Sequence, residues 1–372
     1  MDTNTQQSPP VWGFQKTLQC APTMFRAGQI PYLIGGPGLG KSAIARLIAK
    51  AVGRDLVIVI GSNLDPTDIG GMPLVTIVDG ERVLERVPMK AIRECLRPGV
   101  ILLLDELTGV PLSVRQPMLR LTNEKVAGDL ELNKDLWIMA AGNLPEECPA
   151  GQEVDAALGN RVKQVVFRPL REEVCSHIRT LGDSGSPLRN AAITWSATAL
   201  EDGQLIQFAP PEESIQTGHP FASPRAIEGG LKMLAQAEVD GLDKSLQRDL
   251  LQTAWGQAIT ARYWGILQYA EFLPSSKEIC ANPTTAKLPT RTEHQIAAFG
   301  VVNRAATVDG WAAWAYTARL PDEVAHRVSR QLLADNVARS SKMSKKSPHA
   351  KIGRAAMKKA IIANQKAVKG AL

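Results

Sequence analysis

The sequence has no apolar run of about 18 residues, the length that a membrane-spanning helix needs. Its five cysteines are scattered and form no C-x-x-C pair, which argues against a disulfide framework or a zinc site. The opening MDTNTQQSPP lacks the basic and apolar regions of a secretory signal. We therefore expect a cytoplasmic protein without membrane insertion, with a disordered lead-in over residues 1–10.

Charge is unevenly distributed along the chain. The 372 residues are 44% hydrophobic and 22% charged, which is ordinary for a soluble chain of two or three domains. The net charge is +6, but residues 341–372 alone carry eight Lys, one Arg and no acidic residue, which leaves −3 for the rest. The basic character is thus expected to belong to a tail and not to the folded body.

Short apolar runs alternate with helical patterns over residues 11–169. YLIG precedes a glycine loop and SAIARLIAKAV follows it with helical spacing, while LVIVI, GVILLLDE, LWIMAAGN and KQVVF read as further strands. A continuous apolar run such as GVILLLDE is typical of a strand buried on both faces of a parallel sheet. The alternation predicts an α/β domain with helices on both sides of the sheet.

The pattern changes after residue 169. Residues 170–270 have mostly helical spacing and predict a small helical domain. Residues 271–340 are expected to hold a linker followed by a helical C-terminal region, in which Trp311 and Trp314 are interpreted as core residues. Residues 341–372 form the basic tail, which could become a helix from Lys351 that packs on the body or on an acidic partner.

The glycine loop GGPGLGKS fits the phosphate-binding pattern G-x-x-x-x-G-K-[ST]. Glycine amides and the free N–H groups of a helix start can point at phosphate oxygens. In this motif Lys41 offsets phosphate charge and Ser42 coordinates Mg²⁺. The predicted cofactor-binding residues are Gly35, Gly36, Pro37, Gly38, Leu39, Gly40, Lys41, Ser42 and Ala43.

Polar residues end two further predicted strands. Asp105 closes GVILLLDE, where a carboxylate would be costly unless it meets a metal or its bound water. Glu106 follows at once and suits polarising an attacking water. Asn143 ends LWIMAAGN and would reach the same place if its strand neighbours that of Asp105, although an Asn that starts a turn before Pro145 is an equal alternative.

These elements, in this order, resemble the AAA+ ATPases and more narrowly their MoxR-like group, over roughly residues 10–270. SNLDPTDIGGMPLV with DGERVLERVPMKAI is similar to the helix-2 insert hairpin of the family. VRQPMLRLTNEKV is similar to the helix after Walker B, and AGDLELNKDLW to the hairpin before sensor 1. FASPRAIEGGL contains the Ser-Pro-Arg-Ala motif of the sensor 2 helix.

The resemblance implies ATP and Mg²⁺ as cofactors and gives each site residue a role. Asp105 and Ser42 would hold the metal, Glu106 would activate water, and Asn143 and Arg225 would be sensors 1 and 2. Arg161 stands where the family has its trans-acting arginine finger, but the sequence reads GNRVKQVVF and not Asp-Arg-Phe. Other arginines compete for this role: Arg115, Arg120 and Arg168.

The resemblance also implies a ring, most often a hexamer, that remodels or activates a client protein, often one with a von Willebrand factor A domain. The insert hairpin, residues 64–88, would touch the client, or would only help to close the ring. A nucleic-acid motor that uses the basic tail is the alternative. By family position, the adenine is expected near Val11, Trp12, Gly13, Ile30 and Pro31, although Trp12 could equally pack the N-terminal segment on the sheet.

Overall fold

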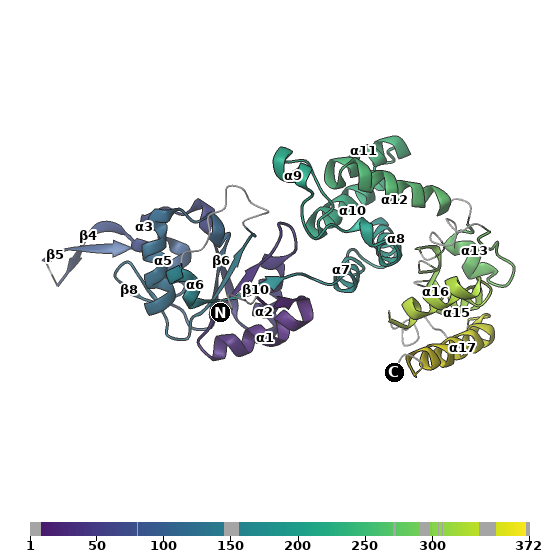
Figure 1. Ribbon diagram of the computed structural model, residues 1–372, viewed down its shortest axis with the longest axis horizontal. Coiled ribbons are helices and arrows are strands. Elements are labelled where there is room, and N and C mark those ends of the chain that lie inside the picture. Colours follow the sequence, from purple (N-terminus) through teal and green to yellow (C-terminus); the bar gives the residue numbers. More distant parts are fainter. Residues whose placement is uncertain are drawn as a thin grey trace, which may run out of the picture. The chain divides into compact units, whose positions relative to one another are not determined.

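The computed structural model describes residues 9–79, 81–144, 156–270, 273–290, 298, 300–303, 305–306, 308–334 and 347–369. Most of the expected lead-in, and parts of the expected linker and basic tail, lie outside these residues. The chain divides into two compact units (Figure 1). The first holds the chain up to Leu170 together with Phe208–His219 and Ser223–Arg225, and the second holds the remainder.

The first unit is built on a six-stranded sheet in which every neighbouring pair is parallel. From one edge to the other the strands are β1 (Val11–Trp12), β10 (Val162–Phe167), β2 (Ile30–Ile34), β9 (Trp137–Gly142), β6 (Val100–Asp105) and β3 (Asp55–Ile60). The predicted parallel α/β fold is therefore confirmed. The short edge strand β1 is an addition that the sequence did not suggest.

Helices cover both faces of this sheet. Side chains alternate between faces along a strand, so Ile101 and Leu103 of β6 point to one face, and Leu102 and Leu104 to the other. The first face packs on α1 (Phe14–Arg26) and α2 (Lys41–Val52). The opposite face packs on α3 (Pro66–Gly70), α4 (Lys90–Glu94), α5 (Leu112–Glu124) and α6 (Ala156–Arg161). All four β6 residues are buried, which explains the uninterrupted apolar run.

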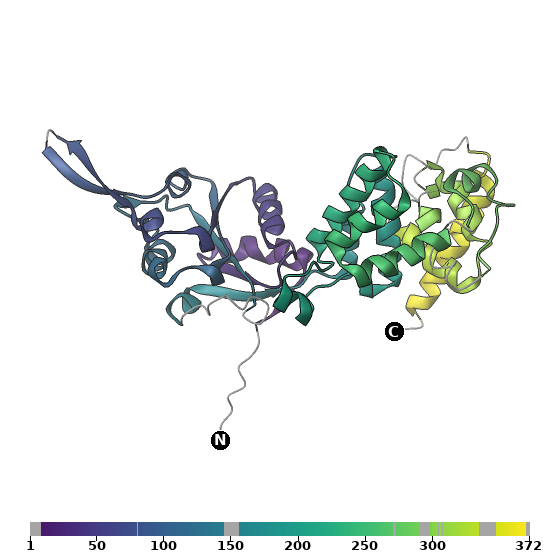
Figure 2. The ribbon, with the colours of Figure 1, turned by 90° about the horizontal axis from the view of Figure 1, so that it is seen from above.

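Two antiparallel hairpins extend this unit. The longer one pairs β4 (Met72–Val78) with β5 (Glu81–Val87), and the shorter pairs β7 (Val126–Ala127) with β8 (Leu130–Glu131). Figure 2 shows the β4–β5 hairpin as a ribbon that projects beyond the helices of the first unit. The first unit also contains the 3₁₀ turns η1 (Gly61–Asn63) and η2 (Leu107–Gly109), and the helix α9 (Glu212–Thr217).

Where the structure describes the second unit, its elements apart from the 3₁₀ turn η4 (Gly203–Leu205) are helices. They are α7 (Arg171–Ile178), α8 (Pro187–Glu201), α10 (Pro224–Val239), α11 (Lys244–Trp255), α12 (Gln257–Ala270), α13 (Ser276–Ala281), α15 (Gly310–Thr317), α16 (Asp322–Ala334) and α17 (Ala350–Lys369); the first residues of α10 belong to the first unit. Trp311 and Trp314 lie in α15 and are buried, in agreement with their interpretation as core residues. α13 lies inside the segment expected to be a linker and starts with a Ser275–Glu278 capping box.

Much of the basic tail is a helix that packs on the second unit. Ala356, Met357 and Ala360 of α17 join the apolar cluster of α15 and α16. A Cβ on Gly353 would lie 2.3 Å from the main-chain oxygen of Trp311, so this contact needs glycine. Of the alternatives left open by the sequence, packing on the body is the one observed. No described helix is long and apolar enough to cross a membrane.

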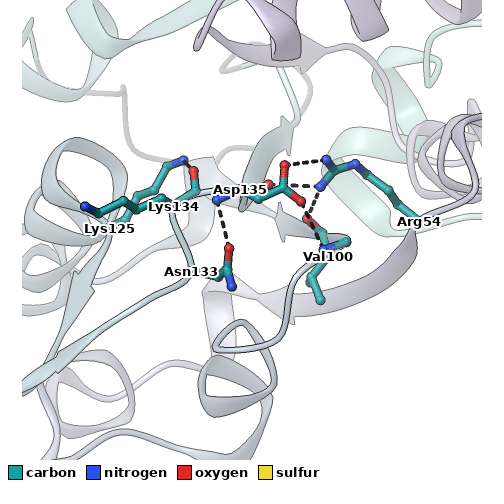
Figure 3. A network of polar contacts seen from close by, with 7 residues as sticks. Arg54, Val100, Lys125, Asn133, Lys134 and Asp135 are labelled. Atoms are coloured by element: carbon teal, nitrogen blue, oxygen red, sulfur yellow. Dashed lines mark hydrogen bonds and ion pairs between the residues drawn. The ribbon is translucent and has the colours of Figure 1, made fainter.

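A polar network ties together the amino ends of β3, β6 and β9 (Figure 3). Arg54, directly before β3, donates to the Asp135 carboxylate at 2.6 Å and to the Asp135 main-chain oxygen at 2.9 Å. Its guanidinium also lies 3.7 Å from the ring centroid of Trp137, the first residue of β9. Asp135 accepts a further hydrogen bond, at 3.1 Å, from the N–H of Gly99 before β6. These charge-assisted bonds help to hold three strands in register.

The ion pair makes stability depend on pH. The Arg54 guanidinium, together with the Gly99 N–H, holds the pKa of the Asp135 carboxyl below its usual value. A carboxylate of lowered pKa contributes its full stabilisation above the unfolded pKa of about 3.9 and loses it as pH falls through the folded pKa.

Asp135→Asn should therefore lower the thermal midpoint at pH 7, because the charge that pairs with Arg54 is removed. The difference from wild type should shrink as pH falls below about 4, because the carboxyl of the unfolded chain is protonated first and that of the folded chain only at lower pH. Thermal unfolding followed from neutral to acidic pH measures this, with Asp249→Asn on the exposed side of α11 as the control. A difference that is constant with pH would contradict the role given to the Asp135 charge.

Candidate nucleotide site

Four strands of the parallel sheet bring polar residues together at their carboxyl ends, a side of the sheet that we call its carboxyl edge; the opposite side is its amino edge. Because parallel strands end at the same edge, the loops after β2, β3, β6 and β9 meet there. The glycine loop follows β2, and Ser62 lies two residues after β3. Asp105 ends β6 and is followed by Glu106, and Asn143 follows β9. The adjacency of β6 and β9 is the condition under which the sequence placed Asn143 near Asp105, and the structure fulfils it.

The glycine loop curves between β2 and α2. Gly38 and Gly40 have φ values of 76° and 94°, a region that side chains with a Cβ rarely adopt. Gly40 directly precedes Lys41, the first residue of α2, so the unpaired N–H groups of this 12-residue helix open toward the loop. Leu39 is buried in the core and anchors the loop, whereas Pro37 is half-buried and Ala43 is exposed.

The Lys41 ammonium lies inside the curve of the loop. It donates to the main-chain oxygens of Gly35 at 2.6 Å and Gly36 at 2.8 Å, and to Asn143 Oδ1 at 2.9 Å. Only 8% of Lys41 is exposed. A buried ammonium at a helix start is a strong attractor for an anion.

Ser42 and Asp105 form the next layer of the site. Ser42 Oγ donates to Asp105 Oδ2 at 2.5 Å, which joins the first turn of α2 to the end of β6. A hydroxyl beside a carboxylate, next to a phosphate cradle, is a typical partial ligand set for Mg²⁺, which takes its other ligands from phosphate and water. Both side chains are half-buried, so this pair is open to a ligand.

Glu106 has a strained and well-supported position. Its φ of 54° is in the left-handed region, which is uncommon for a residue with a Cβ and often marks functional sites. Its carboxylate accepts a hydrogen bond from Ser62 Oγ, and its N–H donates to Asp105 Oδ1 at 3.0 Å. The sequence did not suggest Ser62, although a polar residue two positions after β3 was the available signal.

Asn143 and Arg225 both contact the glycine loop. Asn143 reaches Lys41 with its side chain, and its N–H donates to Thr108 Oγ1 at 3.2 Å. The Arg225 N–H donates to the main-chain oxygen of Gly38 at 3.1 Å, and the Arg225 side chain is exposed. Both residues predicted as sensors are thus placed beside the loop in the first unit.

Arg161 is not part of this cluster. It ends α6 and directly precedes β10, at the amino edge of the sheet, whereas the glycine loop is at the carboxyl edge. There it lines a cavity of about 600 Å³ together with Arg86 and Arg120. Of the competing arginines, Arg120 shares this cavity, whereas Arg168 follows β10 at the carboxyl edge.

The residues expected around an adenine separate into two groups. Ile30 and Pro31 are buried at the amino end of β2, so the structure does not bring these two residues to the glycine loop. Trp12 pairs with Phe167 in β1 and packs against the α1–α2 side of the core. Phe14, which the sequence did not suggest, is closer, since a Cβ on Gly40 would lie 3.3 Å from its Cζ.

The geometry fits a nucleoside triphosphate with Mg²⁺. A Cβ on Gly35 would lie 2.5 Å from the Phe167 main-chain oxygen, so the loop can take this close course only with glycine there. The resulting curve presents backbone amides, a buried ammonium and a hydroxyl–carboxylate pair on one side. These groups match phosphate oxygens and a small divalent cation respectively.

Comparison with known proteins gives a match to one family model and matches to solved structures. The sequence profile of the AAA domain (dynein-related subfamily) matches residues 32–162. No curated protein matches the chain. Among solved structures, the RuvB Holliday junction branch migration motor of Thermotoga maritima is 14% identical with a TM-score of 0.36, covering 73% of this chain and 75% of its own.

A second solved structure, a proposed ATPase of Cytophaga hutchinsonii, is 14% identical with a TM-score of 0.33, and the match covers 66% of this chain and 82% of that one. The matched residues 32–162 run from β2 to the first residue of β10 and include the glycine loop, Asp105, Glu106 and Asn143. Over residues 32–162 the chain is therefore similar to the AAA domain (dynein-related subfamily).

Proposed function

We propose that this protein hydrolyses ATP with Mg²⁺ at the carboxyl edge of the first unit. The observation that supports this most strongly is that the consecutive residues Lys41 and Ser42 are hydrogen-bonded to Asn143 and Asp105 respectively. These residues follow or end three separate strands, and they meet where a phosphate, a metal ion and an attacking water would lie next to one another. A site that only bound phosphate would not need Glu106 beside Asp105.

Each residue has a distinct task in this proposal. Mg²⁺–ATP, when bound, supplies the phosphoryl group and the cation that offsets its charge. Lys41 exchanges its carbonyl partners for phosphate oxygens, and Ser42 with Asp105 holds the metal and its water. The Glu106 carboxylate orients and polarises the attacking water and is released from Ser62 to do so. Asn143 and Arg225, which both lie beside the glycine loop, would contact the terminal phosphate.

The position of Arg161 supports a ring. A guanidinium on the far edge of the sheet cannot serve its own nucleotide, but it can serve that of a neighbouring copy in a head-to-tail ring. The family resemblance makes six copies the expected number and a client protein, which is remodelled or activated, the expected target. A von Willebrand factor A domain in the client follows from the resemblance alone.

A nucleic-acid motor is the second candidate. The observation in its favour is the set of exposed cations on the described part of α17, namely Lys351, Arg354, Lys358 and Lys359. They lie on the helix that packs on the second unit through Ala356 and Ala360. A folded basic face of this kind could attract phosphates without reading sequence.

Glu106→Gln should bind ATP and assemble, yet hydrolyse it slower by orders of magnitude, because the neutral amide cannot polarise water. Turnover and ATP binding are measured side by side, with Glu131→Gln in β8 as the control. Wild-type turnover in Glu106→Gln would remove Glu106 from the mechanism.

The same variant identifies the target when it is purified from the native host with ATP and Mg²⁺, with and without nuclease. A protein partner that survives nuclease supports remodelling. Co-purified nucleic acid whose digestion releases every partner supports the motor.

Arg161→Ala should reduce turnover by roughly 10³-fold or more, as loss of a trans-acting arginine does in GTPases. It should not weaken ATP binding, since Arg161 is remote from the glycine loop. The sharper test mixes Arg161→Ala with Glu106→Gln, both inactive alone. In a mixed ring the intact site of the first receives Arg161 from the second, so activity should return.

Mixtures that contain Arg120→Ala or Arg168→Ala in place of Arg161→Ala provide the matched controls. If mixing with Arg161→Ala restores nothing while one of these controls does, the finger is the other arginine. If no mixture recovers activity, the site does not depend on a neighbouring copy.

A further inference from the structure

The β4–β5 hairpin exposes apolar side chains on both of its faces. Opposite residues of an antiparallel pair share a face, so the register places Met72, Leu74 and Val83 on one face. It places Val75, Ile77 and Leu84 on the other face. The exposed fractions of these six residues range from 39% to 75%. An isolated hairpin of two strands is only marginally stable in water, so we expect both faces to pack against another surface.

The charges of the hairpin are sorted by face. Glu81 and Glu85 share the face of Met72 and Leu74, which we call the acidic face. Arg82 and Arg86 share the face of Val75 and Ile77, which we call the basic face. Within the described part of the chain, none of these four side chains forms an ion pair. The two faces are therefore similar in apolar content and opposite in charge.

We propose that the hairpins of neighbouring copies stack on one another, with the acidic face of one on the basic face of the next. This deepens the ring proposed above and rests on it. Such a contact buries both apolar surfaces and pairs Glu81 and Glu85 with Arg82 and Arg86 of the neighbour. Repeated around a closed ring, it leaves no hairpin face uncovered.

A two-fold contact between copies is disfavoured by the same charges. A face that packs on itself would bring Arg82 and Arg86 against their own copies, or Glu81 and Glu85 against theirs, and like charges at short distance repel. Only a head-to-tail contact joins unlike faces. The hairpin thus specifies the direction of assembly, independently of the nucleotide site.

Two double variants test the stacking. Arg82→Glu with Arg86→Glu makes both faces acidic, and Glu81→Arg with Glu85→Arg makes both basic. Each alone should raise the protein concentration for half-assembly by about tenfold or more, because every contact then opposes like charges. Mass photometry or sedimentation with ATP and Mg²⁺ measures this, with Arg248→Glu on α11 as the charge control.

Mixing the two double variants in equal amounts should restore assembly, with copies that alternate and therefore rings of even number. A chain with all four charges reversed should assemble like wild type, which also shows that the substitutions leave the fold intact. Double variants that assemble like wild type, or a mixture that does not recover, would overturn the stacking.

The outcome separates this inference from the proposed ring. If wild type does not assemble, the ring itself is wrong. The double variants can also be combined with Glu106→Gln to ask whether the client still co-purifies. If wild type and the double variants all assemble but the combined variants no longer capture the client, the hairpin faces the client and not its neighbour.

Discussion

The parallel pairing of β2, β9, β6 and β3 is the constraint on which the site depends. It makes four strands end at one edge, and it brings Asp105 to Ser42 and Asn143 to Lys41 although these residues are distant in the chain. The Arg54–Asp135 network secures the amino ends of β3, β6 and β9 (Figure 3). A slip of register by one residue would turn every strand side chain to the other face. By holding the register at the amino ends, the network therefore helps to keep the proposed site residues in place at the carboxyl ends.

The sequence predicted those parts of the fold that local patterns encode. The run ending in Asp105 needed only its own apolar residues to be recognised as a buried strand, and the glycine loop needed only its motif. β1 is two residues long and pairs with β10, more than 150 positions later in the chain, so no local period reveals it. Ser62 was not predicted for a similar reason. Its hydrogen bond to Glu106 becomes apparent only when β3 lies beside β6.

Tertiary context also decided the elements whose sequence was ambiguous. The sequence left open whether a helix in the Lys-rich tail packs on the body or on an acidic partner, and only the packing of Met357 and Gly353 against α15 and its neighbours places it in the second unit. The hairpin shows the opposite case. Its alternation of Arg and Glu pairs was visible in the sequence, but the sorting of these charges by face required the register of β4 with β5. The same register is the basis for the proposed head-to-tail contact between the hairpins of neighbouring copies.

Lys41, Ser42 and Asp105 are proposed to form a site for ATP with Mg²⁺. Calorimetric titration of ATP, with and without Mg²⁺, tests it most directly in wild type, Lys41→Ala and Ser42→Ala. Mg²⁺ should tighten binding in wild type. Ser42→Ala should lose this tightening but keep metal-independent binding, and Lys41→Ala should lose both. Binding that is unchanged in Lys41→Ala, or a Mg²⁺ effect that is unchanged in Ser42→Ala, would contradict it.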